Sequence, residues 1–383
     1  RPSNFTMCQF PYLLSLGVKI SIMEYESRRI MEYNAEQAFL RALDKRQAVD
    51  VYLKIRVRRD HVAQDSLRCI QNHQRDLKKS LRVEFINEPG IDAGGLRKEW
   101  FLLLTRDLFN PSNGLFVYVE ESRFFWFGIT RATDGELLQG HKNNSELYYL
   151  CGVVLGLAIY NSTILDLNFP RSLYKKLCGE KLTMNDFLEL YPITGRNMLK
   201  MCEYDGEDFE DIFTLNHETS FQDCWGKVHR RELCSGGSNK AVNNQNKYEY
   251  TKLWMDFYMS KSIGASFESF HNGFKHVIES DSFKLFDSEE VEQLVCGSPD
   301  KAVDVRMLQS VAHYSSGWSE DSTIVKWFWE IFENYSYREQ RKLLQFVTGS
   351  DRVPATGIST MQFKVTRLGN DSIKLPLAHT CFN

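Results

Sequence analysis

The sequence contains cysteines, but it lacks the spacings that would join them to a metal or to one another. None of the nine cysteines forms a Cys-x-x-Cys pair, and no histidine and cysteine cluster has zinc-site spacing. An odd number of scattered cysteines without a disulfide framework is typical of a reducing compartment. We therefore expect no metal centre, and a cytoplasmic location with the nucleus as a second compartment.

No apolar run is long enough to cross a bilayer. The longest extends from Leu147 to Tyr160, whereas a spanning helix needs roughly 20 apolar residues. The Gly152-x-x-x-Gly156 spacing inside it occurs in membrane dimers. A buried helix whose glycines admit a close neighbour fits this length better. The sequence therefore predicts a buried helix and no membrane span.

An excess of positive charge is also missing. The formal net charge is −3 and the isoelectric point is about 6.4, whereas a nucleic-acid-binding surface needs a basic face. The basic run that ends at Arg59 is short and is followed by Asp60. The Gly94-Gly95 pair has neither of the usual phosphate-loop spacings and fits a tight strand-to-helix turn. We expect no nucleic-acid partner.

Apolar material, in contrast, is ample. Of the 383 residues, 43% are apolar, which is enough for more than one core. The first residue is Arg1, so we expect the chain to be part of a longer protein.

Periodicity assigns helices and strands along the chain. Residues 20–80 have helical spacing, and residues 81–85 alternate as a strand. Residues 115–127 are rich in strand-forming aromatics, and residues 182–285 read as a distinct unit. The apolar stripe of the first helical region consists of Ala35, Phe39, Leu40 and Leu43.

The last 65 or so residues read as a small α/β unit, two helices followed by strands. The first helix is expected over 322–332, and a capping box at Ser336–Glu339 opens the second, which Gly349 closes. Met361 to Val365 alternate as a strand. The small residues Ser315, Ser316 and Gly317 precede this unit and are the best hinge candidate.

The stretch Leu375-Pro-Leu-Ala-His-Thr-Cys-Phe-Asn383 holds the cysteine with the most reactive-looking surroundings. Pro376 fixes its own backbone angle and restricts the residue before it, so the thiol of Cys381 is presented by the backbone and not buried in a helix face. A buried structural cysteine at the end of a strand is the ordinary alternative.

This stretch resembles the catalytic signature of HECT-domain ubiquitin ligases. Three further strings resemble the same family: residues 85–101, 290–300 and 344–354. The resemblance implies a bilobal α+β fold with a large, mostly helical N-terminal lobe over residues 1–314. A subdomain at about 182–285 would bind the conjugating enzyme, residues 315–319 would form a hinge, and 320–383 would form a small α/β catalytic lobe. The family usually continues past this motif, so we expect that lobe to be incomplete.

The resemblance implies that Cys381 accepts ubiquitin as a thioester and passes it to a substrate lysine, without metal or organic cofactor. Such a nucleophile needs thiolate character and freedom to visit donor and acceptor. His379 would share a face with the cysteine in an extended chain, where it would either polarise the thiol or an attacking amine, or orient the loop. Thr380 would donate a hydrogen bond near the thioester. The implied partners are a ubiquitin-conjugating enzyme, ubiquitin and a protein substrate.

The resemblance also implies which residues form the apolar groove that binds the conjugating enzyme. Tyr204 matches the tyrosine of a Glu-Tyr-x-Gly turn, and Tyr250 and Trp254 match two aromatic positions of the following helix. Met198 and Phe213 match less closely. Tyr250 replaces a more familiar phenylalanine, which bears on partner choice.

Two other functions fit the same chain. One is a non-catalytic module that binds a conjugating enzyme or ubiquitin. The other is a cysteine hydrolase, which would need a general base, and the sequence offers none beyond His379. A reducible ubiquitin adduct separates the three.

Overall fold

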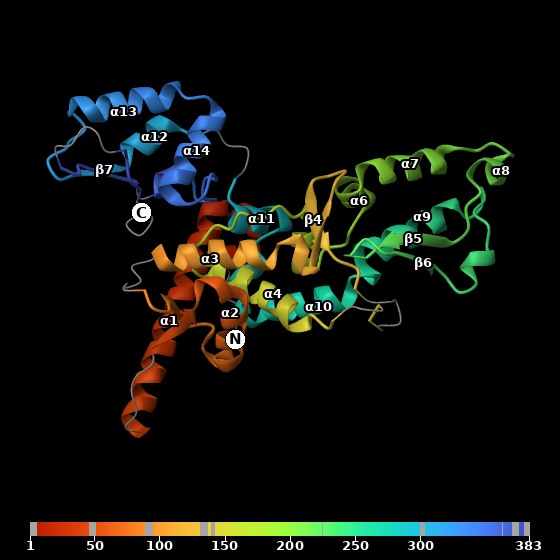
Figure 1. Ribbon diagram of the computed structural model, residues 1–383, viewed down its shortest axis with the longest axis horizontal. Helices are drawn as coiled ribbons and strands as arrows, with labels where there is room; N and C mark the ends of the chain where they lie inside the picture. The colour runs from red at the N-terminus through yellow and green to blue at the C-terminus, as the bar shows by residue number, and fades with distance from the viewer. Residues whose placement is uncertain are drawn as a thin grey trace. The chain divides into compact units, whose positions relative to one another are not determined.

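The computed structural model combines many helices with small two-stranded sheets, which confirms the predicted α+β class (Figure 1). It describes residues 6–45, 51–88, 95–130, 137–138, 142–223, 225–298, 303–361, 363–369 and 375–378. Within these ranges, none of the helices combines the length and the apolar character needed to cross a membrane.

The α-helices are α1 (Leu16–Lys45), α2 (Val62–Asn72), α3 (Gly95–Leu108), α4 (Ser145–Tyr160), α5 (Arg171–Cys178), α6 (Met184–Leu190), α7 (Pro192–Glu203), α8 (Phe209–Phe213), α9 (Lys247–Asp256), α10 (Gly264–Val277), α11 (Ser288–Cys296), α12 (Val305–Ser310), α13 (Thr323–Asn334) and α14 (Tyr337–Thr348). The strands are β1 (Tyr52–Val57), β2 (Ser80–Phe85), β3 (Phe116–Val119), β4 (Phe124–Phe127), β5 (Glu218–Gln222), β6 (Val228–Glu232), β7 (Ala312–Ser315) and β8 (Phe363–Thr366).

Contacts between Cα atoms divide the chain into two compact units. Unit 1 comprises Arg1–Asp107, Val154–Leu167 and His276–Asn383, and unit 2 comprises Leu108–Val153 and Asn168–Lys275. The predicted lobe boundaries remain predictions, because this division by contacts does not test them.

The first sheet of unit 1 corrects one expectation. Residues 20–80 were expected to be helical, but β1 lies among them and pairs in parallel with β2. Leu53, Ile55 and Val57 are buried while the residues between them are exposed. This period of two is short and is flanked by helices, which is why helical spacing over the longer window obscured it. The strand expected at 81–85 is confirmed as β2.

A buried ion pair attaches α1 to the rest of unit 1. The ammonium of Lys19 contacts both carboxylate oxygens of Glu290 on α11, at 2.8 and 2.7 Å, and the lysine is 4% exposed. The predicted stripe further along α1 is helical but not buried, since Phe39 and Leu43 are 50% and 60% exposed.

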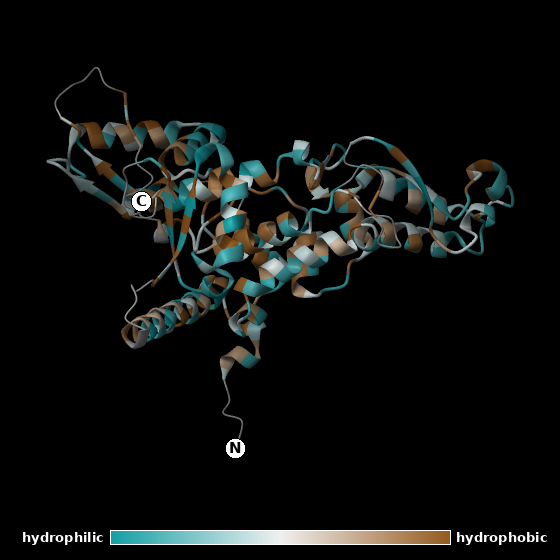
Figure 2. Ribbon diagram, turned by 60° about the horizontal axis from the view of Figure 1, so that its bottom comes forward, coloured by the Kyte–Doolittle hydropathy of each residue, from teal (hydrophilic) through white to brown (hydrophobic). Residues whose placement is uncertain are grey.

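The C-terminal part of unit 1 has its own core. Helices α13 and α14 occupy the expected positions, and the capping box at Ser336 and Glu339 is present. Strands β7 and β8 pair in parallel. The residues of this core are Val303, Val305, Leu308, Val325, Trp329, Phe332, Leu344, Val353, Ile358 and Phe363. Figure 2 shows the division of the helices into hydrophobic and hydrophilic stretches.

The hinge candidates lie inside this part of the chain. Ser315 is the last residue of β7, and its hydroxyl lies 2.8 Å from that of Thr366 at the end of β8. Ser316 and Gly317 adopt left-handed backbone conformations, with φ of 59° and 89°. Core residues precede and follow this turn, and the lobe boundaries expected at 314 and 320 remain predictions. The hinge itself remains a prediction.

Arg352 links this core to the preceding part of unit 1. Its guanidinium donates to the carbonyls of Cys296 and Leu167, both at 3.4 Å. The amide of Ser298 donates to the Val353 carbonyl at 2.9 Å. All three bonds are accepted by backbone carbonyls. The contact between this core and the preceding part of unit 1 therefore depends on the backbone conformation at these residues.

The parts of helices α4 and α10 that belong to unit 2 approach closely. A Cβ on Gly152 would overlap the backbone carbonyl of Phe270, and a Cβ on Gly273 would overlap that of Tyr149. Residues 150–160 are all buried. The expected buried helix is therefore confirmed, and Gly152 lies at a close contact with a neighbouring helix.

We predict that Gly273→Ala destabilises the fold by about 1–3 kcal/mol, because the added methyl meets backbone that cannot turn away. Gly264→Ala is the matched control on the same helix, where a Cβ would meet nothing within 4 Å. Urea unfolding measures both variants. Equal midpoints for the two would contradict the close contact.

Replacing Ser315, Ser316 and Gly317 by prolines is expected to lower the melting temperature. Proline is fixed near φ −65°, whereas positions 316 and 317 have positive φ. A hinge at this turn would in addition slow ubiquitin transfer per folded molecule and leave conjugating-enzyme binding intact. Thermal unfolding gives the folded fraction, and unchanged transfer in that fraction would argue against a mobile hinge.

Candidate functional site

The cysteine motif lies mostly outside the described residues. Cys381, His379 and Thr380 all fall there, and Leu375–Ala378 is the part of the motif that the structure describes. Leu375 and Leu377 are 83% and 68% exposed. The chemical roles assigned to Cys381, His379 and Thr380 remain predictions.

The other cysteines divide by burial. Seven lie in the described part of the chain, and Cys151, Cys202 and Cys296 are buried. The thiol of Cys296 donates to the Leu167 carbonyl at 3.4 Å, and that of Cys202 lies 3.3 Å from the Thr251 hydroxyl. Burial raises the pKa of the Cys151 thiol. Thiols held in this way behave as small apolar groups, so Cys296 is structural, as expected.

Tyr204 and Phe213 are brought together at the turn between α7 and α8. Their ring centroids lie 5.7 Å apart, and the ring of Phe209, the first residue of α8, lies 6.3 Å from that of Tyr204. The Tyr204 hydroxyl donates to Asp208 at 2.5 Å, and this hydrogen bond raises the pKa of the tyrosine. Both predicted residues are partly exposed. They therefore form an aromatic surface at this turn.

Gly206 lies close to the same hydrogen bond. A Cβ at this position would overlap the Tyr204 hydroxyl and lie 2.5 Å from the Asp208 carboxylate. The glycine of the Glu-Tyr-x-Gly pattern thus leaves room for the tyrosine to reach its carboxylate partner without a shift of either side chain.

Trp254 lies in a separate aromatic cluster. Its ring stacks on Tyr258 at 3.9 Å and packs edge-on against Phe187 at 5.4 Å. The tryptophan is partly exposed, so it contributes both to packing and to the surface. A π-helical segment, Phe257–Lys261, directly follows α9. Such segments are often found at functional sites, and no sequence signal indicated this one.

Tyr250 and Met198 are placed beneath the surface. They are 4% and 7% exposed, and the Tyr250 ring lies 5.6 Å from that of His217. Burial raises the pKa of Tyr250 to about 12. Their partner-binding role remains a prediction, and their burial leaves little of either side chain accessible to a partner.

Two further residues of this region are exposed. Ile212, which sequence reasoning missed, is 53% exposed, and Tyr248, one of the aromatics on the predicted helix, is 65% exposed. Tyr248 donates its hydroxyl to the Cys202 carbonyl at 3.2 Å. Its position two residues before Tyr250 on α9 could have indicated a different face, since neighbours on one helical face are three or four residues apart.

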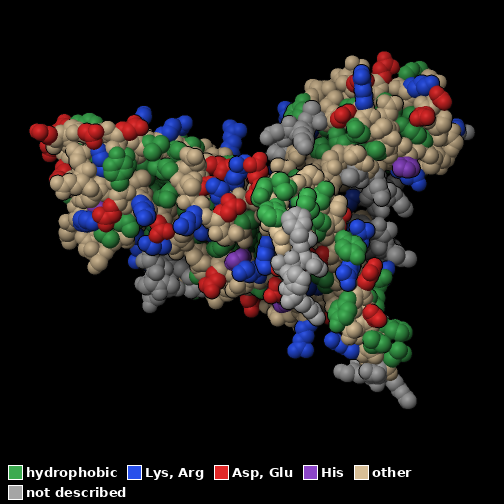
Figure 3. Space-filling view, turned by 180° about the vertical axis from the view of Figure 1, so that it is seen from behind, with side chains coloured by type: hydrophobic (Ala, Val, Ile, Leu, Met, Phe, Trp, Pro, Cys, Tyr) green, Lys and Arg blue, Asp and Glu red, His purple; other side chains and the backbone are tan. Residues whose placement is uncertain are grey.

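Acidic side chains surround this aromatic surface. Residues 203–211 include six carboxylates and no lysine or arginine, and all six acidic residues are exposed. Figure 3 shows acidic side chains gathered at the end of unit 2 that carries α8. A partner that docks here would benefit from positive charge at its margin.

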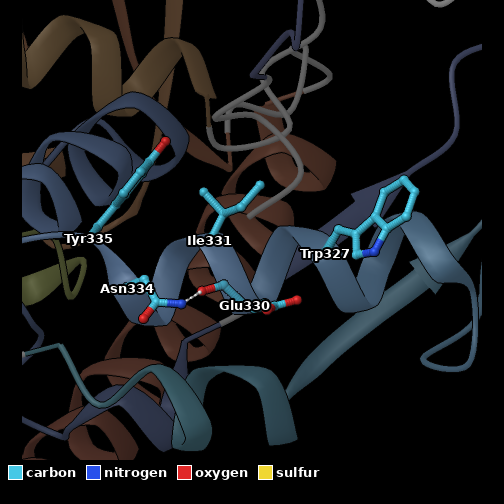
Figure 4. Close-up of a pocket in the computed structure, with 5 residues that line it drawn as sticks. All are labelled: Trp327, Glu330, Ile331, Asn334 and Tyr335. Carbon is cyan, nitrogen blue, oxygen red and sulfur yellow. Dashed lines mark hydrogen bonds between the residues drawn. The ribbon is translucent and has the colours of Figure 1, made fainter.

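A second exposed apolar face lies on α13 in unit 1. Trp327 and Ile331 project from the helix and Tyr335 directly follows it; with Glu330 and Asn334 they line a shallow pocket of about 410 Å³ (Figure 4). The Asn334 amide donates to the Glu330 carbonyl at 2.8 Å. Trp327 is 59% exposed. No predicted site residue lies in this pocket.

Comparison with known proteins gives one family. Residues 102–383 match the model of the HECT-domain (ubiquitin-transferase) family. The chain is 67% identical over 384 residues to the "Probable E3 ubiquitin-protein ligase HUL4" of Eremothecium gossypii, covering 100% of this chain and 46% of that protein. It is 37% identical to the "Probable E3 ubiquitin-protein ligase mug30" of Schizosaccharomyces pombe, over 99% of this chain and 49% of the relative.

A human relative is similar to the chain over nearly its whole length. The "Probable E3 ubiquitin-protein ligase HECTD2" of Homo sapiens is 36% identical over 397 residues, covering 99% of this chain and 49% of that protein. The chain thus spans about half the length of the curated relatives it matches. The family match includes the stretch that ends in Cys381 and the aromatic turn at Tyr204. The chain therefore belongs to the HECT-domain family of ubiquitin transferases.

Proposed function

We propose that this chain is the catalytic part of a ubiquitin-protein ligase that carries ubiquitin on Cys381. Family membership over residues 102–383 is the observation that supports this most strongly. It also favours a ligase over a non-catalytic binding module, because the motif Leu375–Asn383 includes the nucleophile that turnover needs.

The chemistry has two acyl transfers. The Cys381 thiolate attacks the carbonyl carbon of the thioester on the conjugating enzyme, a new S–C bond forms, and the conjugating enzyme's cysteine leaves as thiolate. A substrate lysine amine then attacks the new thioester, an amide forms, the Cys381 thiolate leaves, and the amine gives up a proton. The first step exchanges like for like and the second is downhill, so neither needs ATP.

His379 and Thr380 are proposed as helpers of this cysteine. A histidine two residues from the thiol could take up the amine's proton or hold the loop. Tyr204, Phe213 and Trp254 would contact the conjugating enzyme, with Tyr250 and Met198 beneath them. The reducing environment suggested by the scattered cysteines supports a cytoplasmic or nuclear location.

We expect Cys381 to be the residue that forms the ubiquitin thioester. With ubiquitin-charged conjugating enzyme, the full-length protein should give an adduct that a reducing agent removes. Cys381→Ala should give none, and Cys381→Ser should accumulate an oxyester that resists thiols, because an alkoxide is the poorer leaving group. His379→Ala should slow charging or discharge without abolishing both.

Cys296→Ala is the matched control for that experiment, because its thiol is buried and hydrogen-bonded to a backbone carbonyl. It should charge normally in the folded fraction. A reducible adduct on the Cys381→Ala variant would rule out the assignment. Cleavage of ubiquitin chains without an adduct would instead indicate a hydrolase.

Trp254→Ala is expected to weaken conjugating-enzyme binding by more than about 2 kcal/mol, as aromatic anchors at interfaces often do. Trp225→Ala is the control, since that tryptophan is 62% exposed in the same unit but lies outside both aromatic clusters. Calorimetric titration measures affinity and thermal unfolding measures stability. Normal affinity together with a large loss of stability would assign Trp254 to the core alone.

A further inference from the structure

Lys247, the first residue of α9, has a buried ammonium group. The residue is 2% exposed, and burial of a charge is costly unless every donor finds a partner. The ammonium donates to the Tyr204 carbonyl at 2.6 Å, to the Asp205 carboxylate at 2.8 Å and to the Asn244 side-chain oxygen at 3.2 Å. These three bonds use all three of its protons.

Asn244 completes the same arrangement. Its amide nitrogen donates to the Gly206 carbonyl at 2.8 Å while its oxygen accepts from Lys247. The two side chains therefore hold three consecutive residues, Tyr204, Asp205 and Gly206. That turn presents the Tyr204 ring, so its backbone is fixed from the start of the helix that also carries Trp254.

The charge of Lys247 matters as well as its hydrogen bonds. The segment 203–211 has six carboxylates and supplies no cation of its own. Like charges at this spacing repel one another, and Lys247 supplies positive charge from beneath. Its nitrogen also lies 5.7 Å from the centroid of the Phe209 ring, which is 1% exposed. The lysine thus joins the acidic turn to the aromatic residues under it.

We infer that Lys247 is a positioning residue for conjugating-enzyme binding: with Asn244, its buried ammonium holds the Tyr204–Gly206 turn in the shape that presents Tyr204 to the partner. This inference rests on the proposed function. It goes beyond it by assigning the shape of the surface to a residue that lies beneath it.

The test compares transfer kinetics in the full-length protein, with ubiquitin-charged conjugating enzyme as the varied substrate. Lys247→Met is expected to raise KM by about tenfold and to leave kcat per folded molecule within about twofold, since it removes binding that ground state and transition state share. KM does not depend on how much enzyme is folded, whereas the apparent kcat does. A purely structural lysine would therefore lower the apparent kcat and leave KM unchanged.

Lys240→Met is the matched control. It removes a lysine of the same unit that pairs with Glu249 on α9 at 3.1 Å, but its side chain is 40% exposed and does not touch the turn. Its KM should equal that of the wild type. Lys247→Arg retains the charge and should recover part of the loss.

Asn244→Ala and Asp205→Asn keep the experiment decisive if Lys247→Met does not fold. The Asp205 side chain is 88% exposed, so its replacement does not disturb the core. Both variants should raise KM, Asp205→Asn by the smaller factor because it leaves the two bonds to Tyr204 and Asn244 in place.

A double-mutant cycle identifies the route of the effect. If Lys247 acts through the turn, Lys247→Met should add little to the KM of Tyr204→Ala, whereas its effect should add in full to that of Trp254→Ala. Full additivity with Tyr204→Ala, or an unchanged KM in folded Lys247→Met and Asn244→Ala, would overturn the inference. Failure of the wild type to accept ubiquitin from any conjugating enzyme would instead reject the proposed function.

Discussion

The close approach of α4 and α10 is the constraint on which the arrangement of unit 2 depends. Two glycines allow the backbones to touch, and at each a methyl group would overlap a carbonyl of the other helix. Helix α10 begins at Gly264, shortly after α9 and the π-helical segment that follows it. The segment with Tyr250 and Trp254 therefore enters a helix whose position is fixed by backbone contact, which leaves little freedom to adjust.

At the other end of α9, electrostatics replaces close packing. The acidic segment 203–211 has a side-chain hydrogen bond of its own, from Tyr204 to Asp208, but its six negative charges repel one another. Lys247 and Asn244 fix it through backbone carbonyls and one carboxylate. A helix anchored by packing at one end thus carries a polar clamp at the other, and the aromatic surface lies over both. This arrangement suits a binding surface, since it holds exposed rings in place without burying them.

The sequence indicated the cysteine motif more clearly than it indicated which side chains form the aromatic surface. Cys381 stands in a long, specific motif, and the capping box at Ser336 and Glu339 is a local pattern. Such features depend on a few neighbouring residues and could be read directly. Strand β1 and the parallel pairing of β7 with β8 could not, because a parallel pair joins segments far apart in the chain. For the same reason the burial of Tyr250 was missed: helical spacing shows that it shares a face with Trp254 but not which part of that face is covered.

Lys247 shows the limit of periodicity most clearly. A lysine at the start of a charged helix is most often solvated, and its spacing gives no reason to expect otherwise. Its role depends on a turn more than 40 residues earlier, whose own residues carry only negative charge. Among the 47 lysines and arginines of the chain, nothing in the local sequence distinguishes Lys247. Only the fold, which places its ammonium against the Tyr204 carbonyl and the Asp205 carboxylate, identifies it as the partner of this acidic segment.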